Sequence, residues 1–275
     1  MIIGFIGTGN MGGAILEGYA SSKASEGDRL LVYNLVEEHS QRVLERTAGR
    51  CEILGSNADV CRNADVVVIG VKPQVIDVVL EEIAEPFKEN ENRILVSMAA
   101  GVSIEHLTEF LGEKAKIIRI MPNTPAKVGE AMTAVARNGL VTDDEFYRVK
   151  TIFDSIGSAE EIDESLIDCV IGVSGSSPAY TYMYIEALVN ASVANGMDRE
   201  KARIFAAQAV LGAAKMVLES EESIEQLRIN VCSPGGTTIE AVNKLFENGF
   251  MEKTMEGFQA AVDKSIKMTE EKKGK

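Results

Sequence analysis

The chain of 275 residues is 45% hydrophobic and 25% charged, and it is long enough for two domains with substantial cores. Its formal net charge of −14 at pH 7 argues against nucleic acid or an anionic membrane surface as a partner. Any anionic cofactor would therefore have to be held by local dipoles and a few cations.

Residues 1–160 alternate between short β-branched runs and helical patterns. The runs predicted to be strands are Ile2–Ile6, Leu30–Tyr33, Val66–Ile69, Ile94–Ser97, Ile117–Met121 and Met132–Ala136. Helical patterns lie between them, such as Gln74–Ile83, whose valines and Ile83 fall on one face. Continuous apolar strands separated by helices are typical of a parallel sheet covered on both faces. The sequence therefore predicts an α/β fold with a doubly wound, Rossmann-type dinucleotide-binding domain over 1–160.

The first predicted strand runs directly into a glycine-rich turn, Ile6-Gly7-Thr8-Gly9-Asn10-Met11-Gly12. In the dinucleotide-binding pattern the first glycine makes a tight turn and the second lets the pyrophosphate approach the backbone. The third lets the helix pack on the strand. We expect the helix to begin near Asn10, with its dipole aimed at the phosphates. Such a turn also occurs for structural reasons alone, but its place at the start of an alternating βα region favours a cofactor site.

The end of the second predicted strand bears on the choice between the two nicotinamide cofactors. An acidic residue there would hold the ribose diol of NADH and repel the 2′-phosphate of NADPH. The sequence at this point is Val32-Tyr33-Asn34-Leu35-Val36, and the first acidic residue is Glu37. The missing acid favours NADPH and leaves NADH as the alternative.

From about Asp163 the strand-like runs stop and long helical patterns continue through Lys267, which predicts an all-α domain over 161–275. Segments 177–195 and 199–219 carry small and apolar residues on more than one face. A helix that is apolar around most of its circumference has to be buried on several sides, so we expect a subunit interface in a homodimer. A self-contained bundle core is the alternative. The charged stretch 269–275 is predicted to be a solvated tail.

The segment Val-Cys-Ser-Pro-Gly-Gly-Thr-Thr at 231–238 combines a rigid turn with two glycines and three hydroxyls. Thr237 and Glu240 fit a capping box, which predicts a helix start at Thr237. The free N–H groups of that helix start, widened by Gly235 and Gly236, would form a site for a small anion. Because the segment has no Lys or Arg, one carboxylate suits it better than a polyphosphate. The alternative is a Pro-Gly turn before a capped helix.

The four cysteines have no paired spacing, and the chain has only two histidines, which argues against a zinc cluster. We expect reduced thiols, no metal and a cytoplasmic protein. A first strand at Met1 or Ile2 would leave no room for a signal peptide, and no apolar run approaches the roughly 18 residues that a membrane span needs.

Seven ordered segments of the chain resemble one family, the pyrroline-5-carboxylate reductases. These segments are GFIGTGNMGGAI at 4–15, GVKPQ at 70–74, AAGVS at 99–103, RIMPNTPA at 119–126, SGSSPAY at 174–180, GAAKM at 212–216 and SPGGTT at 233–238. The resemblance implies NADPH- or NADH-dependent reduction of 1-pyrroline-5-carboxylate to L-proline, the last step of proline biosynthesis. It also implies an intertwined homodimer formed through the C-terminal helices, which in this family often assembles further.

The resemblance also implies which side chains bind the substrate. The substrate carboxylate would sit on the amides of the SPGGTT turn, with hydroxyls of Ser233 and Thr237 adding hydrogen bonds. Thr238 would lie near the ring nitrogen as a hydrogen-bond partner and proton relay. Two acidic residues match family positions near the substrate: Glu221, which would counter the iminium charge, and Glu164. Without the resemblance, both acids would be expected on a solvated acidic face.

Further cofactor contacts implied by the resemblance lie outside the glycine-rich turn. They are Asn34, Asn57, Val71-Lys72-Pro73, Ala99-Ala100 and Asn230. Asn57 would lie at the adenosine end, Lys72 would offset the acidic field, and the two alanines would leave room for the nicotinamide ring. The chain departs from the family at Leu35, where many members have an arginine that would grip the 2′-phosphate, and at Ser177, where glycine is usual.

Two other functions are compatible with parts of the sequence. A β-hydroxyacid dehydrogenase-like oxidoreductase also joins a nucleotide domain to a helical one, but that class uses a lysine on a long helix, and segment 177–195 has none. A non-catalytic dinucleotide sensor would be expected to have degenerate loops, and both loops here are intact.

Overall fold

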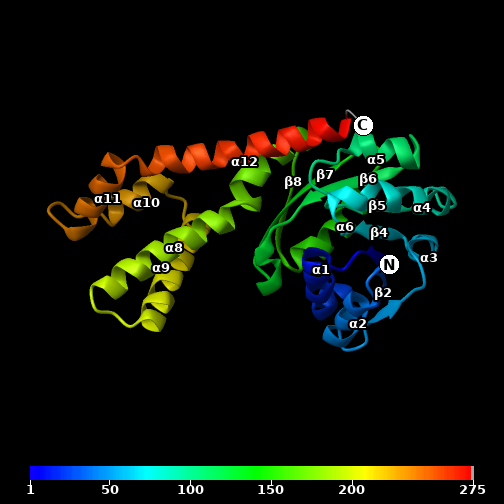
Figure 1. Ribbon diagram of the computed structural model, residues 1–275, viewed down its shortest axis with the longest axis horizontal. Coiled ribbons are helices and arrows are strands. Elements are labelled where there is room, and N and C mark those ends of the chain that lie inside the picture. Colours follow the sequence, from blue (N-terminus) through cyan, green and yellow to red (C-terminus); the bar gives the residue numbers. More distant parts are fainter. Residues whose placement is uncertain (274–275) are drawn as a thin grey trace. The chain divides into compact units, whose positions relative to one another are not determined.

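The computed structural model describes residues 1–273, which form two compact units (Figure 1). The sheet unit contains Met1–Ser176 together with the C-terminal segment that begins at Ala261, and the helical unit contains Ser177–Ala260. The predicted boundary at 160/161 lies inside the last strand of the sheet. The assignment of a cofactor-binding and a substrate-binding domain to the two sides of that boundary stays a prediction.

The sheet unit is built on a sheet of eight strands in the order β3-β2-β1-β4-β5-β6-β7-β8. The strands are β1 Ile2–Ile6, β2 Arg29–Tyr33, β3 Cys51–Ile53, β4 Val66–Ile69, β5 Ile94–Ser97, β6 Lys116–Met121, β7 Ala131–Arg137 and β8 Gly157–Glu161. Neighbouring strands pair in parallel except β6 and β7, which are antiparallel. The predicted doubly wound α/β fold is confirmed.

Helices cover both faces of this sheet, and each layer packs into its own apolar core. On one face lie α1 Asn10–Ser21, α2 Glu37–Arg46 and α6 Asp143–Asp154. On the other lie α3 Asn57–Asn63, α4 Ile76–Lys88 and α5 Ile104–Leu111. All four residues of β4 are buried, because a central strand covered on both faces has no solvent side.

Three sequence expectations about the sheet need correction. The two edge strands, β3 and β8, were not predicted, because β3 has only three residues and β8 is a polar run, Gly-Ser-Ala-Glu-Glu, in which only Ala159 is buried. The strand predicted at Met132–Ala136 exists as β7, but it runs antiparallel to β6 rather than parallel. The connection between them is fewer than a dozen residues long and carries a 3-10 turn, Thr124–Val128, which is too short for a parallel crossover.

The helix predicted at Gln74–Ile83 is also different in detail. A 3-10 turn, Pro73–Val75, precedes α4, which begins at Ile76. The buried face of α4 includes Ile76 and Ile83, whereas Val75 and Val78 are about half exposed. These two valines are therefore available to line a binding site rather than the core.

The helical unit consists of α8 Ser177–Ala194, α9 Arg199–Glu219, α10 Ile224–Asn230, α11 Thr237–Glu247 and the first part of α12 Phe250–Lys273. The antiparallel pair α8 and α9 packs around Val189, Ala202 and Ala206. Ser177 begins α8 without a positive φ, so the position does not require the glycine that is usual in the resembled family.

The predicted tail at 269–275 is wrong for residues 269–273, which continue α12. The Lys272 ammonium pairs with Asp77 at 2.7 Å, and Thr269 donates to the Ser265 carbonyl. The first contact docks the end of α12 on α4 of the sheet unit, whereas the second lies within α12 itself. Residues 274 and 275 lie outside the described residues. Among residues 1–273, no helix has the length and apolar character that crossing a lipid bilayer requires.

Candidate functional site

The glycine-rich turn leads from β1 into α1 at the carboxyl edge of the sheet. Gly7 has a φ of +87°, and a Cβ there would lie 2.7 Å from Val71 Cγ1. A Cβ on Gly12 would lie 2.3 Å from the carbonyl oxygen of Gly7. Both positions therefore need glycine, Gly7 for its left-handed backbone and Gly12 for close approach within the turn.

Gly9 precedes α1, which begins at Asn10 as predicted. No side chain from the described residues caps this helix, and the first intrahelical bond runs from the Gly13 N–H to the Gly9 carbonyl at 3.0 Å. The N–H groups of the first helical turn are thus left for an anion. A Cβ added at Gly9 would have no described atom within 4 Å, so the space beside Gly9 is open to a ligand.

Asn34 ties the glycine-rich turn to the end of β2. Its Oδ1 accepts the Thr8 N–H at 2.6 Å, and its Nδ2 donates to the hydroxyls of Thr8 and Ser40. Thr8 itself is fully buried. These bonds use the Asn34 amide to position the turn.

A cavity of about 420 Å³ opens between this turn and the ends of β2 and β4. It brings together seven of the predicted cofactor residues: Ile6, Gly7, Gly9, Asn34, Asn57, Val71 and Lys72. Its wall is mostly apolar, with Tyr33, Val75 and Val78 among the lining side chains. The Lys72 ammonium, the Glu82 carboxylate and the N-terminus of α1 lie at the edge of this apolar slot, which has the character of a small-molecule site.

The other residues of the sheet unit that are predicted to contact the cofactor do not line this cavity. Asn10 lines a neighbouring cavity, and Met11 is half-buried against the core. Pro73 begins the 3-10 turn after Lys72. Ala99 and Ala100 follow β5, where Ala99 is buried in one core and Ala100 packs on another.

The neighbouring cavity reveals an arginine that the sequence reasoning missed. It measures about 680 Å³, is lined by Gly9 and Asn10 of the turn, and also by Arg42 of α2. The Arg42 Nη2 lies 3.5 Å from the Thr8 carbonyl oxygen, and its Nε is buried without a hydrogen-bond partner among the described residues. In the sequence, Arg42 is marked only by its place in the helical pattern that follows the second strand, eight residues after Asn34.

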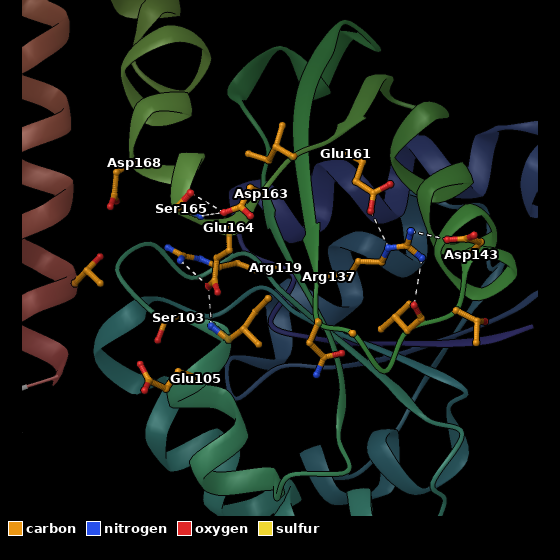
Figure 2. Close-up of a pocket in the computed structure, with 17 residues that line it drawn as sticks. Ser103, Glu105, Arg119, Arg137, Asp143, Glu161, Asp163, Glu164, Ser165 and Asp168 are labelled. Carbon is orange, nitrogen blue, oxygen red and sulfur yellow. Dashed lines mark hydrogen bonds and ion pairs between the residues drawn. The ribbon is translucent and has the colours of Figure 1, made fainter.

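Glu164 lies in a different cavity of the sheet unit, of about 1240 Å³ (Figure 2). Its Oε1 accepts a hydrogen bond from the Arg119 guanidinium at 2.9 Å and one from the Ile104 N–H at 2.7 Å. Arg119 is buried, and its Nε and Nη2 have no partner in the described part of the chain. Glu164 therefore joins β6 to the start of α5, a structural contact that replaces the expectation of a solvated acidic face.

The predicted substrate loop lies in the helical unit, between α10 and α11. Gly235 has a φ of +66°, and the Gly236 N–H donates to the Ser233 carbonyl at 2.9 Å, which closes a tight turn. Helix α11 begins at Thr237 as predicted, but the capping box is wrong. Gly236 is the N-cap residue and no described side chain caps the helix, because Thr237 is already one residue inside it.

This turn keeps its polar groups accessible. Ser233, Thr237 and Thr238 are all exposed, and the N–H groups at the start of α11 have no side-chain cap from the described residues. Glu221 is exposed in the connection between α9 and α10. The Asn230 amide, predicted to touch the cofactor, donates to Glu222 within the helical unit.

The helical unit exposes a large apolar surface in the single chain. Met183 of α8, Phe205 of α9 and Leu218 near its end are 69%, 68% and 85% exposed. Helices α8 and α9 contribute only three buried residues, Val189, Ala202 and Ala206, among those described. Large exposed apolar surfaces of this kind mark a protein interface.

Comparison with known proteins agrees with these features. The family model "Pyrroline-5-carboxylate reductase dimerisation" matches residues 164–268, and "NADP oxidoreductase coenzyme F420-dependent" matches residues 2–101. The pyrroline-5-carboxylate reductase of Escherichia coli is 45% identical over 272 residues, covering 97% of this chain and 98% of the relative.

Solved structures give the same result. The pyrroline carboxylate reductase of Plasmodium falciparum with NADP bound is 32% identical with a TM-score of 0.86, and covers 98% of both chains. The enzyme from Coxiella burnetii is 34% identical with a TM-score of 0.88, and covers 97% of this chain and 98% of that one. By sequence over nearly its whole length and by structure, the chain belongs to the pyrroline-5-carboxylate reductase family.

Proposed function

We propose that this protein reduces 1-pyrroline-5-carboxylate to L-proline with a nicotinamide dinucleotide. The observation that carries the proposal is the 45% identity to a pyrroline-5-carboxylate reductase over almost the entire chain. The glycine-rich turn with its cavity in the sheet unit and the uncapped α11 start in the helical unit support it, because they provide the two kinds of binding site that the reaction needs.

When bound, the nicotinamide supplies a hydride to the imine carbon, and a proton adds to the ring nitrogen, so that the C=N double bond becomes a single C–N bond. The imine is a strong electrophile once protonated. The protein therefore has mainly to align the two reactants and exclude water. Backbone amides and hydroxyl groups are sufficient to meet this requirement.

We assign the binding roles as follows. The turn from Gly7 to Gly12 and the first amides of α1 hold the pyrophosphate, while Lys72 adds a positive charge at the cavity edge. The substrate carboxylate binds the amides of 233–237, assisted by the exposed hydroxyls of Ser233 and Thr237. Thr238 contacts the ring nitrogen and relays its proton, and Glu221 and Glu164 remain proposed partners of the iminium.

We propose NADPH rather than NADH as the preferred cofactor. The residues after β2 are Asn34, Leu35 and Val36, and the first acid is Glu37 in α2, so no carboxylate at the strand end repels a 2′-phosphate. The related Plasmodium falciparum enzyme has NADP bound, which supports the same choice.

We further propose a homodimer formed by the helical units, with the option of higher assembly. The exposed apolar surface of α8 and α9 and the match to a dimerisation family model support this proposal. A cytoplasmic location is consistent with four cysteines that are all unpaired in the described chain.

One assay separates this function from the alternatives. Oxidation of NADPH and of NADH is followed with 1-pyrroline-5-carboxylate and, in parallel, with small keto acids. Turnover restricted to the cyclic imine is expected. Reduction of the keto acids would instead indicate a hydroxyacid dehydrogenase-like enzyme, and cofactor binding without any turnover would indicate a sensor. Helix α8 contains no lysine, which already disfavours the dehydrogenase.

Thr238→Ala tests the site itself. The variant should lower kcat strongly while the dissociation constant of NADPH changes little, because the hydroxyl contacts substrate rather than nucleotide. Thr151→Ala is the matched control, since Thr151 is exposed on α6 and its hydroxyl donates only to the Arg148 carbonyl of its own helix. Kinetics of Thr238→Ala that equal those of the control would remove Thr238 from the mechanism.

A further inference from the structure

We infer that Arg42 of α2 recognises the 2′-phosphate of NADPH, taking over the role of the arginine that this chain lacks at position 35. The inference rests on the proposed function, because it assumes that the cavity at the glycine-rich turn holds a nicotinamide dinucleotide. It concerns which of the two dinucleotides the site prefers and which side chain makes that choice.

The side chain after Asn34 cannot hydrogen-bond a phosphate. Leu35 is 92% exposed and has no polar side-chain atom. Glu37 and Glu38 follow at the start of α2 and supply no positive charge. A preference for the phosphorylated cofactor therefore needs a cation that reaches the site from elsewhere.

Arg42 is placed to supply that cation. It lies on α2 one and a half turns beyond the helix start, and its Nη2 is 3.5 Å from the Thr8 carbonyl oxygen in the glycine-rich turn. The Nε of Arg42 is buried and has no hydrogen-bond acceptor among residues 1–273. A buried donor without a partner is costly, and a bound anion would satisfy it.

The cavity next to Arg42 has the charge that a phosphate requires. Its lining includes the cations Arg42, Arg46 and Lys127 and a single carboxylate, Glu17. Arg42 also borders a smaller cavity lined by Glu37, Glu38 and Glu45, but it forms no ion pair with these carboxylates in the described part of the chain. The Glu17 carboxylate is already paired with Arg46 at 3.2 Å, so its charge is largely compensated. The chain has a net charge of −14, so a cluster of positive charges beside the glycine-rich turn indicates a binding site for an anion.

The two cavities meet at one residue. Gly9 lines both the apolar cavity that fits the adenosine and the cationic cavity that contains Arg42. In this fold the adenosine ribose of a dinucleotide lies at the end of the second strand, and a nearby arginine accommodates a 2′-phosphate. Helix α2 follows that strand directly and carries Arg42. A guanidinium matches the geometry of a phosphate through two parallel N–H groups, which makes arginine well suited to this position.

The test measures binding without substrate. Dissociation constants of 2′,5′-ADP and 5′-AMP, and of NADP⁺ and NAD⁺, are determined by calorimetry for the full-length protein and its variants. Arg42→Met should weaken 2′,5′-ADP and NADP⁺ by about tenfold or more while 5′-AMP and NAD⁺ change by less than about threefold. Arg42→Lys keeps the positive charge but loses the planar pair of N–H donors, so its dissociation constants for 2′,5′-ADP and NADP⁺ should lie between those of wild type and Arg42→Met.

Arg29→Met is the matched control. Arg29 lies at the opposite end of β2 and pairs with Glu52 at 3.1 Å on the surface, so removing it should leave all four constants unchanged. Leu35→Arg should restore tight 2′,5′-ADP binding in the Arg42→Met background, because it returns a guanidinium to the strand end. Circular dichroism establishes that each variant is folded.

Two results would overturn the inference. If Arg42→Met weakens NADP⁺ and NAD⁺ equally, Arg42 only supports the turn through Thr8. If it weakens neither, the 2′-phosphate lies elsewhere. Both results are compatible with reduction of 1-pyrroline-5-carboxylate by the wild type, whereas failure of that reduction with either cofactor would refute the proposed function and leave the binding data intact.

Discussion

Replacing Gly12 by alanine tests how the glycine-rich turn is built. The added Cβ would lie 2.3 Å from the carbonyl oxygen of Gly7 and 3.6 Å from the Cα of Gly70. The first distance is well inside van der Waals contact, and the obstructing atom belongs to backbone that cannot rotate away. The turn or the start of α1 must therefore move.

The expected loss of unfolding free energy has two parts, the backbone shift forced by this overlap and the change in helix propensity from glycine to alanine. Forcing a backbone shift in a well-packed region costs about 3 kcal/mol. The higher helix propensity of alanine offsets about 1 kcal/mol of this loss relative to glycine. The net loss is then about 2 kcal/mol, which corresponds to a decrease in Tm of roughly 4–8 °C for a domain of this size.

Gly9→Ala is the informative partner of Gly12→Ala. A Cβ there meets no described atom within 4 Å, and the φ of Gly9 is −66°, so the protein should keep its Tm. The same Cβ occupies the space that the pyrophosphate needs, so nucleotide affinity should fall. Thermal unfolding by circular dichroism and nucleotide titration measure the two effects. An unchanged or raised Tm for Gly12→Ala would refute the reasoning.

Two other predictions concern contacts that hold the sheet unit together. Burial raises the pKa of Asp77, but hydrogen bonds with Lys272 and His106 outweigh it and hold the pKa below its ordinary value of 3.8. The stabilisation by the Asp77 carboxylate is thus complete above about pH 5 and is lost as the pH falls through the lowered pKa. The difference in unfolding free energy between wild type and Asp77→Asn should therefore shrink from about pH 6 to about pH 3. Urea titrations measure this difference. A constant difference would contradict this. Glu164→Gln should lower the free energy of unfolding by about 2–3 kcal/mol, because it leaves the buried Arg119 without its counter-charge. Adding Arg119→Met should recover part of that loss. Equal stability of Glu164→Gln and wild type in urea would show that the pair is not structural.

Local sequence pattern was sufficient for much of the fold. The predicted strands Ile2–Ile6 and Val66–Ile69 coincide with β1 and β4, and α1 begins at Asn10. These features depend on neighbouring residues alone, since a β-branched run favours a strand and a glycine permits the φ of +87° at Gly7. The resemblance in seven motifs also identified the family before any tertiary contact was known.

Other features were decided only by contacts between distant parts of the chain. The polar run of β8 becomes a strand because β7 lies beside it, and β7 is antiparallel because its connection to β6 is short. Glu164 gains its partner Arg119 from a strand 45 residues away. Arg42 reaches Thr8 from 34 residues away. Sequence pattern reports the propensity of a segment, whereas the pairing of such segments depends on which backbone and side-chain groups the packed sheet brings together.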